Sequence, residues 1–455
     1  MYGGAICSCD QVQARCFSFL QWQFFNLQNN VTYGIRSEGE KILGGQMIKE
    51  KRSVLVVATM DTKGKEALFL MDCFKETGVP VLTLDAGIMG ESPFEATVGR
   101  KEVARAGGMA LEQVRKLEQE GEALAVMING AAVCAQRLYR EKRIHGIICI
   151  GGSMGTTLGT GVMRGFPVGF PKVMISTMAS RNTRFFVGTK DIIMVHSVCD
   201  LSGINRITAQ VLRNGALAMA GMIKGAGKIW TAGKPAVVLS TLGTTEHCAQ
   251  ALRKSLEKSG KEVIVFHTVG SGGEAMEGFI RDEQVEAVID LSLHELADHR
   301  FGGDYDAGPL RGLAALTRGV PTIIVPGNID FLVTGPLKSA RQRFPRRRYH
   351  IHNAAITTIR TRKEEVAAIA RLLVKFCSKA KGPAAVLVPS GGFSVWDRAG
   401  GPFYDPKAVK VFIEIMEKKL SPKIPLRVFP YNINDPDFAV AVHETLEKLL
   451  SASRS

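Results

Sequence analysis

The chain has 455 residues, of which 45% are hydrophobic, and a formal net charge of +15 at pH 7. This length allows two or three ordinary cores, and the hydrophobic fraction is typical of a globular protein. No apolar run reaches the length of a membrane span, so we expect no membrane partner. The nine cysteines include no Cys-x-x-Cys pair. This usage indicates a reduced, cytoplasmic protein and argues against a disulfide framework.

Much of the visible clustering of positive charge lies in one stretch, which holds Lys338, Arg341, Arg343, Arg346, Arg347 and Arg348. A basic balance favours nucleic acid as a partner. Elsewhere, however, the positive charges alternate with acids, and no RNA-binding aromatic pattern appears. We therefore expect a small anionic molecule to meet some of these arginines in preference to nucleic acid. A solvated basic loop is the alternative.

Residues 1–46 differ from everything that follows. They carry three of the nine cysteines and a cluster of aromatic residues without a sustained period. They lack the charged start and small-residue cleavage site of a secretory signal. Met47, followed by Ile-Lys-Glu-Lys-Arg, resembles a natural start. We predict that residues 1–46 are a disordered or misassigned leader, with a genuine N-terminal extension as the alternative.

An alternation of strands and helices begins at Ser53. Apolar, β-branched runs predict strands, and 3.6-residue periodicity predicts helices. The predicted strands are residues 54–58, 80–84, 147–150, 172–176 and 191–195. The predicted helices are residues 63–76, 109–142 with an interruption at Gly121, and 204–224. This pattern predicts one α/β domain over residues 47–225, and the glycine-rich residues 226–234 are the best linker in the chain.

The second half begins like the first. Thr59 and Thr241 each end a strand, and Gly78 and Gly260, each 19 residues later, end the helix that follows. The pairs Gly169-Phe-Pro and Gly319-Val-Pro each introduce a strand. We predict a related second domain over residues 235–455. The fold class is α/β, with two doubly wound, Rossmann-like domains and mostly parallel sheets.

A glycine-rich loop follows the third strand, with the sequence Gly-Gly-Ser-Met-Gly-Thr-Thr over residues 151–157. Glycines allow a tight turn and bring backbone N–H groups close to a ligand. A helix that starts here adds its positive end, which favours an anion. The loop therefore predicts a phosphate cradle, although it is neither a Walker loop nor a Gly-x-Gly-x-x-Gly fingerprint. The alternative is a plain strand-to-helix turn. The predicted contacts are Gly151, Gly152, Ser153, Gly155, Thr156 and Thr157.

Other polar residues near strand ends could complete this site, because ligands collect at the carboxyl ends of parallel strands. Asp61 could accept a hydrogen bond from a ribose hydroxyl or hold Mg²⁺, and Lys63 could neutralise phosphate. The alternatives are a helix N-cap for Asp61 and a solvated lysine for Lys63. The remaining candidates are Thr59, Thr62, Thr177, Gly188, Thr189 and Asp191.

A second group of candidates lies in the second half. The spacing of His350 and His352 places two imidazoles on one side of an extended segment, which is compatible with a metal pair. No Cys or acid lies at a regular ligand spacing, so we assign no metal and favour an anion site. Its candidate residues are His350, His352, Asn353, Arg360, Ser390 and Gly391. No catalytic residue is predicted, and Cys149 lies inside a strand, where an inert thiol is expected.

Several of these motifs, taken in order, resemble one known family. They include Ala-Thr-Met-Asp-Thr-Lys over residues 58–63, Ile-Gly-Gly-Ser-Met-Gly-Thr over 150–156, and His-Ile-His-Asn over 350–353. Similar motifs continue through Phe-Tyr-Asp-Pro at 403–406 to Tyr-Asn-Ile-Asn-Asp at 431–435. Together they are similar to the tobamovirus-resistance-protein-like ATP-binding family, which is largely uncharacterised, over residues 53–450.

This resemblance implies ATP, with or without Mg²⁺, as the ligand of the first domain. Some relatives continue into a TIM-barrel domain resembling phosphoenolpyruvate hydrolases, so a separate barrel protein of that kind could be a partner. We also expect a homo-oligomer. Two alternatives to a nucleotide-binding protein stay open. One is an enzyme acting on a small phosphorylated or carboxylated metabolite in the interdomain cleft, and the other is an interaction module gated by nucleotide.

Overall fold

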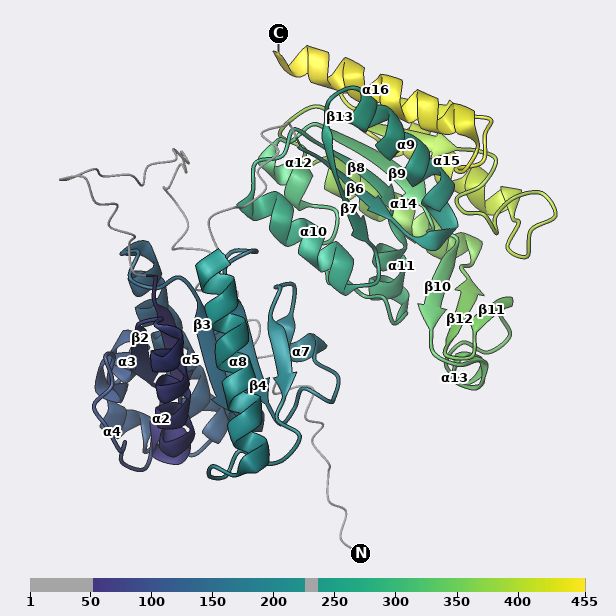
Figure 1. The fold of residues 1–455 in the computed structure, drawn as a ribbon. Helices are drawn as coiled ribbons and strands as arrows, with labels where there is room; N and C mark the ends of the chain where they lie inside the picture. Colours follow the sequence, from purple (N-terminus) through teal and green to yellow (C-terminus); the bar gives the residue numbers. More distant parts are fainter. Residues whose placement is uncertain (1–51, 226–235, 455) are drawn as a thin grey trace, which may run out of the picture. The chain divides into compact units, whose positions relative to one another are not determined.

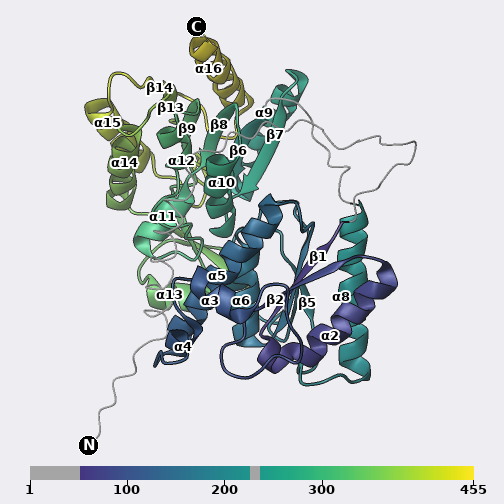
Figure 2. The ribbon, with the colours of Figure 1, turned by 90° about the vertical axis from the view of Figure 1, so that its left-hand side faces the viewer.

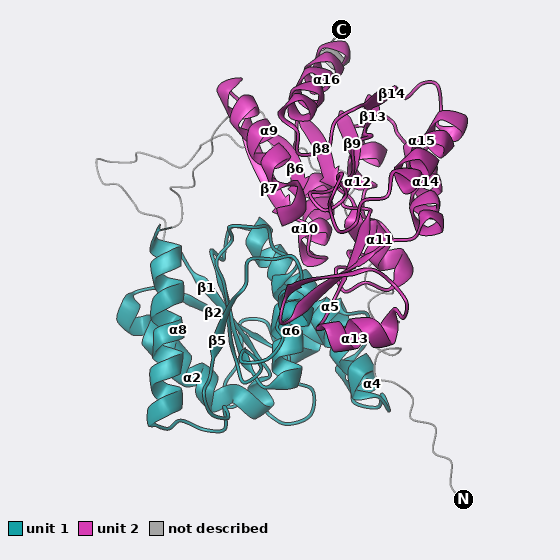
Figure 3. Cartoon of the chain, turned by 90° about the vertical axis from the view of Figure 1, so that its right-hand side faces the viewer, with its two compact units in different colours: residues 1–228 teal, residues 229–455 magenta. Residues whose placement is uncertain are grey.

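A computed structural model describes residues 52–225 and 236–454 of the chain (Figure 1). The chain divides into two compact units, residues 1–228 and 229–455 (Figure 3). The predicted leader, residues 1–46, lies outside the described residues, as does nearly all of the predicted linker, residues 226–234. Among the helices of the described ranges, none combines the length and the apolar character needed to cross a bilayer.

The core of unit 1 is a sheet of five parallel strands in the order β2-β1-β3-β4-β5. Its strands are short and rich in Val and Ile, as expected when helices cover both faces of a parallel sheet. The strands are Val54–Ala58 (β1), Val81–Asp85 (β2), Ile147–Gly151 (β3), Lys172–Ser176 (β4) and Ile193–His196 (β5).

Helices cover both faces of this sheet. In β1 the side chains alternate, so that Val54 and Val56 pack against α2 and α8 while Leu55 and Val57 pack against the helices of the other face. Figure 2 shows the two helix layers on either side of the strands. The helices are Met60–Thr77 (α2), Arg100–Ala106 (α3), Leu111–Val114 (α4), Glu120–Arg140 (α5), Ser153–Met163 (α6), Arg184–Val187 (α7) and Arg206–Gly225 (α8).

Two helix boundaries of unit 1 differ from the prediction. The predicted helix over residues 109–142 is two helices, α4 and α5, and its interruption lies at residues 115–119. Gly121 is the second residue of α5, where a glycine in the first turn does not stop a helix. The first helix begins at Met60 and not at residue 63, and Lys63 takes a non-helical conformation inside it.

Unit 2 is built on a six-stranded parallel sheet in the order β14-β13-β9-β8-β6-β7. The strands are Ala236–Thr241 (β6), Glu262–His267 (β7), Ala287–Ser292 (β8), Thr322–Gly327 (β9), Ala384–Pro389 (β13) and Leu426–Phe429 (β14). Both sheets are doubly wound, which confirms the predicted fold class.

The helices of unit 2 again form two layers. Helices α9 and α16 pack on one face, while α11, α14 and α15 pack on the other, together with α10 and α12. These helices are Glu246–Lys258 (α9), Ser271–Asp282 (α10), His294–Phe301 (α11), Ala314–Arg318 (α12), Lys363–Cys377 (α14), Pro406–Lys419 (α15) and Pro436–Arg454 (α16), and a 3-10 turn, Gly243–Thr245 (η1), precedes α9.

A small antiparallel sheet, which the sequence did not predict, is inserted after β9. It has the order β10-β12-β11, from Phe331–Thr334 (β10), Tyr349–Asn353 (β11) and Ile356–Arg360 (β12). The helix Leu337–Arg343 (α13) lies between β10 and β11 in the chain. The basic stretch therefore forms α13 and its connection to β11. Arg347 is bonded to Glu365 at 2.6 Å and is not a freely solvated charge.

The paired glycines of the two halves have matching conformations. Gly78 and Gly260 have φ of 72° and 83°, and Gly169 and Gly319 have φ of 86° and 77°. Each therefore ends a helix or turns the chain before a strand in the left-handed region, which only glycine adopts without strain. The internal repeat inferred from the sequence corresponds to the same local backbone in both units.

A buried ion cluster holds the loops of unit 2 at the carboxyl ends of β7 and β8. The guanidinium of Arg311 is fully buried and bonds Asp290 at 2.6 Å and Glu295 at 2.7 Å. Glu277 is the third acid of this Arg311 cluster and accepts from the backbone N–H groups of residues 312–314. Burial raises the pKa of both Glu277 and Glu295, although the charge of Arg311 opposes that effect.

We expect Arg311→Met to lower the free energy of unfolding of unit 2 by about 3–5 kcal/mol, because it leaves buried carboxylates without their counter-ion. Urea unfolding of the full chain at pH 7 measures this change. Arg253→Met is the matched control, because Arg253 forms an exposed pair with Glu257 and its loss should cost no more than about 1 kcal/mol. Equal effects of the two changes would show that the Arg311 cluster does not stabilise the fold.

Candidate functional site

The strand order of unit 1 identifies a switch point at the carboxyl edge of its sheet. The chain winds from β1 to β2 on one side and from β3 to β5 on the other, so the winding reverses between β1 and β3. Connections on opposite faces leave a crevice at such a switch point, and ligands of open α/β sheets bind there. The two loops that flank this point are the Thr59 end of β1 and the glycine-rich loop after β3.

Helix α6 begins directly at this point. Its N-cap is Gly152, and no side chain caps it. The first N–H groups of an α-helix have no partner inside the helix and carry the positive end of its dipole. Ser153 and Met154, the first two helical residues, are exposed. The start of α6 can therefore accept an anion from solvent.

The glycines of this loop serve two different purposes. A Cβ at Gly151 would lie 2.6 Å from the Cα of Gly155, so glycine is needed for α6 to pack against the end of β3. A Cβ at Gly152 would meet nothing nearer than the Thr177 hydroxyl at 3.9 Å. Gly152 has φ of −78°, so the loop turns without a left-handed residue. Gly152 is thus the position that is open on the side of a ligand.

Thr156 has a structural role at this loop. Its side chain is fully buried, and its hydroxyl donates to the Gly152 carbonyl at 2.6 Å and bonds the Ser176 hydroxyl at 2.6 Å. Thr157 bonds the Ser153 carbonyl one turn back at 3.0 Å. Both hydroxyls were predicted to face phosphate. The structure instead uses Thr156 to hold the end of β3 against the end of β4.

Thr177 lies directly after β4, and its backbone N–H donates to the Gly151 carbonyl at 3.4 Å. The structure therefore brings Thr177 together with the glycine-rich loop. Thr59 and Thr62 lie at the start of α2, where their hydroxyls bond each other at 2.8 Å. Lys63 is half-buried in the first turns of the same helix. These residues lie at the β1 side of the switch point.

Asp61 was predicted to bind a ligand or to cap a helix, and the structure gives it a further role in the protein itself. Its Oδ2 accepts from the backbone N–H groups of Ile88, Met89 and Gly90 at 3.1–3.2 Å, so it organises the loop after β2 and does not cap α2. Its Oδ1 is buried without a hydrogen-bond partner. Oδ1 is thus the one carboxylate oxygen of Asp61 that the described residues leave unsatisfied.

Two residues at this edge were missed by the sequence analysis. Asp85, the last residue of β2, accepts from the N–H of Met60 at 3.0 Å and so occupies the N-terminus of α2. It also pairs with Arg100 at 2.7 Å. The Nη2 atom of Arg100 is buried without a partner. An acid at the end of a strand was a signal for Asp85, whereas Arg100 follows a loop whose return to this edge no local pattern indicates.

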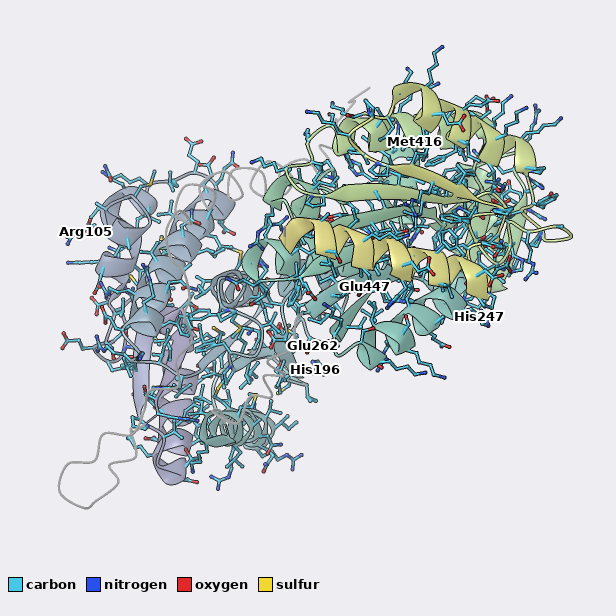
Figure 4. All side chains as sticks on the ribbon, turned by 90° about the horizontal axis from the view of Figure 1, so that it is seen from above. Arg105, His196, His247, Glu262, Met416 and Glu447 are labelled. Carbon is cyan, nitrogen blue, oxygen red and sulfur yellow. The ribbon has the colours of Figure 1, made fainter. Side chains whose placement is uncertain are left out.

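The structure does not bring the predicted group Gly188, Thr189 and Asp191 to the switch point. Asp191 pairs with the buried Lys172 at 2.7 Å and accepts from the N–H of Gly169 at 2.8 Å. Lys172 begins β4 and Asp191 precedes β5, so both lie at the amino edge of the sheet. Gly188 lies against Arg164 at the end of α6. His196, which Figure 4 labels, is exposed and ends β5, so it lies at the carboxyl edge instead.

The corresponding edge of unit 2 is occupied by its own side chains. Glu295 accepts from the N–H groups of Gly270 and Gly273 at 2.7 and 3.1 Å, so a carboxylate already lies at the start of α10. At the switch point between β6 and β8, Thr268 and Asn328 both bond the Ser292 hydroxyl. Asn328 in turn accepts from Thr244 at 2.7 Å. These groups satisfy one another, in contrast to the uncapped start of α6.

The second predicted site is only partly brought together. Arg360 is 3% exposed, and its guanidinium donates to the carbonyls of Phe403 and Asp330 at 2.7 and 2.8 Å. It therefore fixes the small sheet to the following loops. Ser390 and Gly391 bond the carbonyls of Phe429 and Tyr431 and so hold the end of β14.

The histidines of β11 lie around a tryptophan. The rings of His350 and His352 have centroids 4.6 and 6.4 Å from that of Trp396, and burial lowers the pKa of His350. Asn353 is exposed at the end of the same strand. Within residues 52–225 and 236–454, no group of three or more His, Cys, Asp or Glu side chains is placed to hold a metal ion.

Two buried acids, Asp330 and Asp397, adjoin Phe331 and Trp396 in the chain, and the rings of these two aromatic residues are in contact. Burial, reinforced by the charge of Asp397, raises the pKa of Asp330 to about 7. Arg360 opposes this shift, and the Ser394 hydroxyl donates to Asp330 Oδ2 at 2.8 Å. Asp330 Oδ1 has no partner. In unit 1, by contrast, burial raises the pKa of the Cys149 thiol, as expected for an inert cysteine inside a strand.

Comparison with known proteins identifies relatives over most of the chain. Residues 52–228 match the N-terminal domain of an uncharacterised protein family, UPF0261, and residues 234–450 match its C-terminal domain. A UPF0261 protein of Clostridium tetani is 36% identical over 400 residues, which cover 88% of this chain and 99% of that protein.

Two further comparisons concern a plant protein and a solved structure. The ToMV resistance protein Tm-1(GCR237) of Solanum lycopersicum is 33% identical over 341 residues, which cover 73% of this chain and 45% of that protein. A solved structure of an uncharacterized protein from Bacillus cereus ATCC 10987 has 11% identity and a TM-score of 0.26, with 76% of this chain and 93% of that chain covered. At this TM-score the likeness carries no argument.

We expect Thr156→Val to lower the free energy of unfolding of unit 1 by about 1 kcal/mol or more, because it leaves the buried Ser176 hydroxyl without this bond. Thr157→Val, which removes only a bond within α6, should change it by no more than about 0.5 kcal/mol. Thermal or urea unfolding measures both. An undiminished stability in Thr156→Val would contradict the structural role assigned to this hydroxyl.

A second expectation concerns pH and Asp330. Its pKa lies near 3.8 in the unfolded chain and at about 7 in the folded one. Between these values the folded chain keeps a proton that the unfolded chain has lost, so stability falls as the pH rises through this window. The cost is complete above pH 7 and is on the order of a few kcal/mol.

Asp330→Asn should therefore flatten the decline in unfolding free energy between pH 4 and pH 7, because an amide carries no charge to bury. Urea unfolding at a series of pH values measures the slope. Asp437→Asn, at an exposed acid of α16, serves as the control and should keep the slope of the unchanged protein. If Asp330→Asn keeps that slope as well, the buried acid does not titrate as described.

Proposed function

The chain belongs to the uncharacterised protein family UPF0261, and from this premise we propose that unit 1 binds ATP or a related nucleotide at its β1/β3 switch point. The phosphates would lie at the start of α6, over Gly152 and against the N–H groups of Ser153 and Met154. The observation that carries this proposal is an uncapped helix start at the switch point of the sheet.

Two other helix starts support this placement by contrast. At α2 the carboxylate of Asp85 bonds the N–H of Met60, and in unit 2 the carboxylate of Glu295 bonds the N–H groups of Gly270 and Gly273 at the start of α10. The chain thus supplies its own anion at those two places. At α6 no side chain of the described residues does, and a phosphate would take that role.

The residues on the β1 side of the switch point would complete the site. Lys63 supplies a positive charge for a phosphate oxygen. Asp61 fits Mg²⁺ or a ribose hydroxyl only through Oδ1, because its Oδ2 already accepts three N–H groups. A bound Mg²⁺ would neutralise phosphate charge. The choice of ATP among phosphorylated ligands rests on the resemblance of the sequence motifs described above.

Gly152→Ala tests the proposal, because the added methyl group has room within the protein but stands beside the N–H groups that would hold phosphate. We expect calorimetric titration with Mg-ATP to show binding by the unchanged protein and at least about tenfold weaker binding by Gly152→Ala, equivalent to about 1.4 kcal/mol. The thermal midpoint should stay nearly unchanged.

Gly221→Ala is the matched control, since this exposed glycine of α8 also has nothing within 4 Å of an added Cβ. It should keep the affinity. Gly151→Ala separates the structural role, because its Cβ would collide with α6 and should lower the melting temperature. Absence of any nucleotide binding by the unchanged protein at millimolar concentration, with Mg²⁺ present, would refute the proposal.

A further inference from the structure

Unit 2 carries an open groove of ≈ 510 Å³ between the end of α11, the loop that follows it, and α14. This groove lies apart from the residues discussed above as candidate sites. It is lined by Leu296, His299, Arg300, Gly308, Pro309, Leu310, Leu313, Leu372, Lys375, Phe376 and Lys379.

The floor of the groove is apolar. Leu296, Leu313 and Phe376 are almost fully buried members of the main core of unit 2, and Leu372 packs against the same core. A ligand with an apolar body would therefore lie directly on core side chains. Removing apolar surface from water on both partners is favourable at roughly 25 cal/mol per Å².

The rim of the groove is cationic. Arg300, Lys375 and Lys379 contribute three positive charges, and the residues lining the groove include no Asp or Glu. Asp306, an acid of the loop after α11, is bonded to the His299 ring at 2.9 Å. Within the described parts of the chain, none of the three cationic side chains has an ion pair or a hydrogen bond. Their charges are thus available to an anion.

The loop that follows α11 forms one wall of the groove and is held in place by buried contacts. Gly308 and Gly312 have φ of 81° and 84° and bracket the segment that carries Leu310. Between these two glycines lies Arg311, whose guanidinium bonds Asp290 and Glu295 in the buried cluster. The groove is therefore preformed, because the segment above it cannot move without breaking buried ion pairs.

We propose that this groove binds a small amphipathic anion, with a carboxylate or phosphate head at Arg300, Lys375 and Lys379 and a medium-length apolar body on the floor. The volume falls within the range of about 300–1,000 Å³ that is usual for small-molecule sites. Among the lining residues, Leu310 is the one large hydrophobic residue that is mostly exposed, at 54%. One exposed leucine is not the large contiguous apolar patch that marks a protein-docking surface.

Calorimetric titration of the full chain with decanoate tests the proposal, with decyltrimethylammonium and acetate as probes that lack the negative head or the apolar tail. We expect saturable binding of decanoate and much weaker binding of the other two. The combined change Lys375→Gln and Lys379→Gln should weaken decanoate binding roughly tenfold, and added salt should weaken binding by the unchanged protein.

The matched control is the combined change Lys418→Gln and Lys419→Gln, which removes two exposed charges of α15 and should leave the affinity unchanged. Leu372→Trp, which fills the groove from α14, should abolish binding while the protein stays folded by its melting curve. Equal affinity for decyltrimethylammonium, equal loss in the control, or no decanoate binding would overturn the proposal. Binding of an acidic amphipathic peptide with no binding of decanoate would instead identify a protein-docking surface.

Discussion

Both units of this protein depend on the same physical constraint, namely that a helix following a strand brings unpaired N–H groups to the carboxyl edge of the sheet. Buried or not, these donors need an acceptor. In unit 2 the chain supplies one, since Glu295 lies at the start of α10 and Glu277 bonds the N–H groups before α12. In unit 1 Asp85 does the same for α2. At α6 no side chain of the described residues takes this place.

The two units are both doubly wound, but they differ in how the helix starts at this edge are satisfied. The Arg311 cluster joins the loops of unit 2 into one buried network, in which Glu277 and Glu295 each accept from backbone N–H groups as well as facing the guanidinium. Asp290 bonds the guanidinium and the Ser240 hydroxyl. Such a network rigidifies an edge but leaves little for a ligand to satisfy. Unit 1 has a glycine-lined edge with exposed first helical residues. A shared architecture can thus carry an uncapped helix start at the edge of one unit and a buried ionic network at the edge of the other.

Local patterns predicted what depends on local physics. Short apolar, β-branched runs predicted the strands of the first sheet, and Gly78 and Gly260 showed where a helix ends in each unit, because glycine adopts the left-handed conformation without strain. The glycine-rich loop was also predicted to join a strand to a helix, whereas its place at the switch point follows from the strand order. The small sheet of β10, β11 and β12 was missed. Its β11 and β12 form a local hairpin, but β10 pairs with β12 across α13 and β11, and no local pattern indicates that pairing.

The sequence by itself determined the fold class, the family and the loop at which α6 begins, since each follows from residue order over short distances. Only the tertiary structure decided which polar side chains are free. Asp61, Thr156, Asp191 and Arg360 all matched the chemistry of a binding site, yet each bonds groups of the chain itself. A hydrogen-bonding side chain carries the same signal in the sequence whether its partner is a ligand or a distant backbone group. That choice is made by the packing that brings the partner within 3 Å, and packing depends on the whole chain.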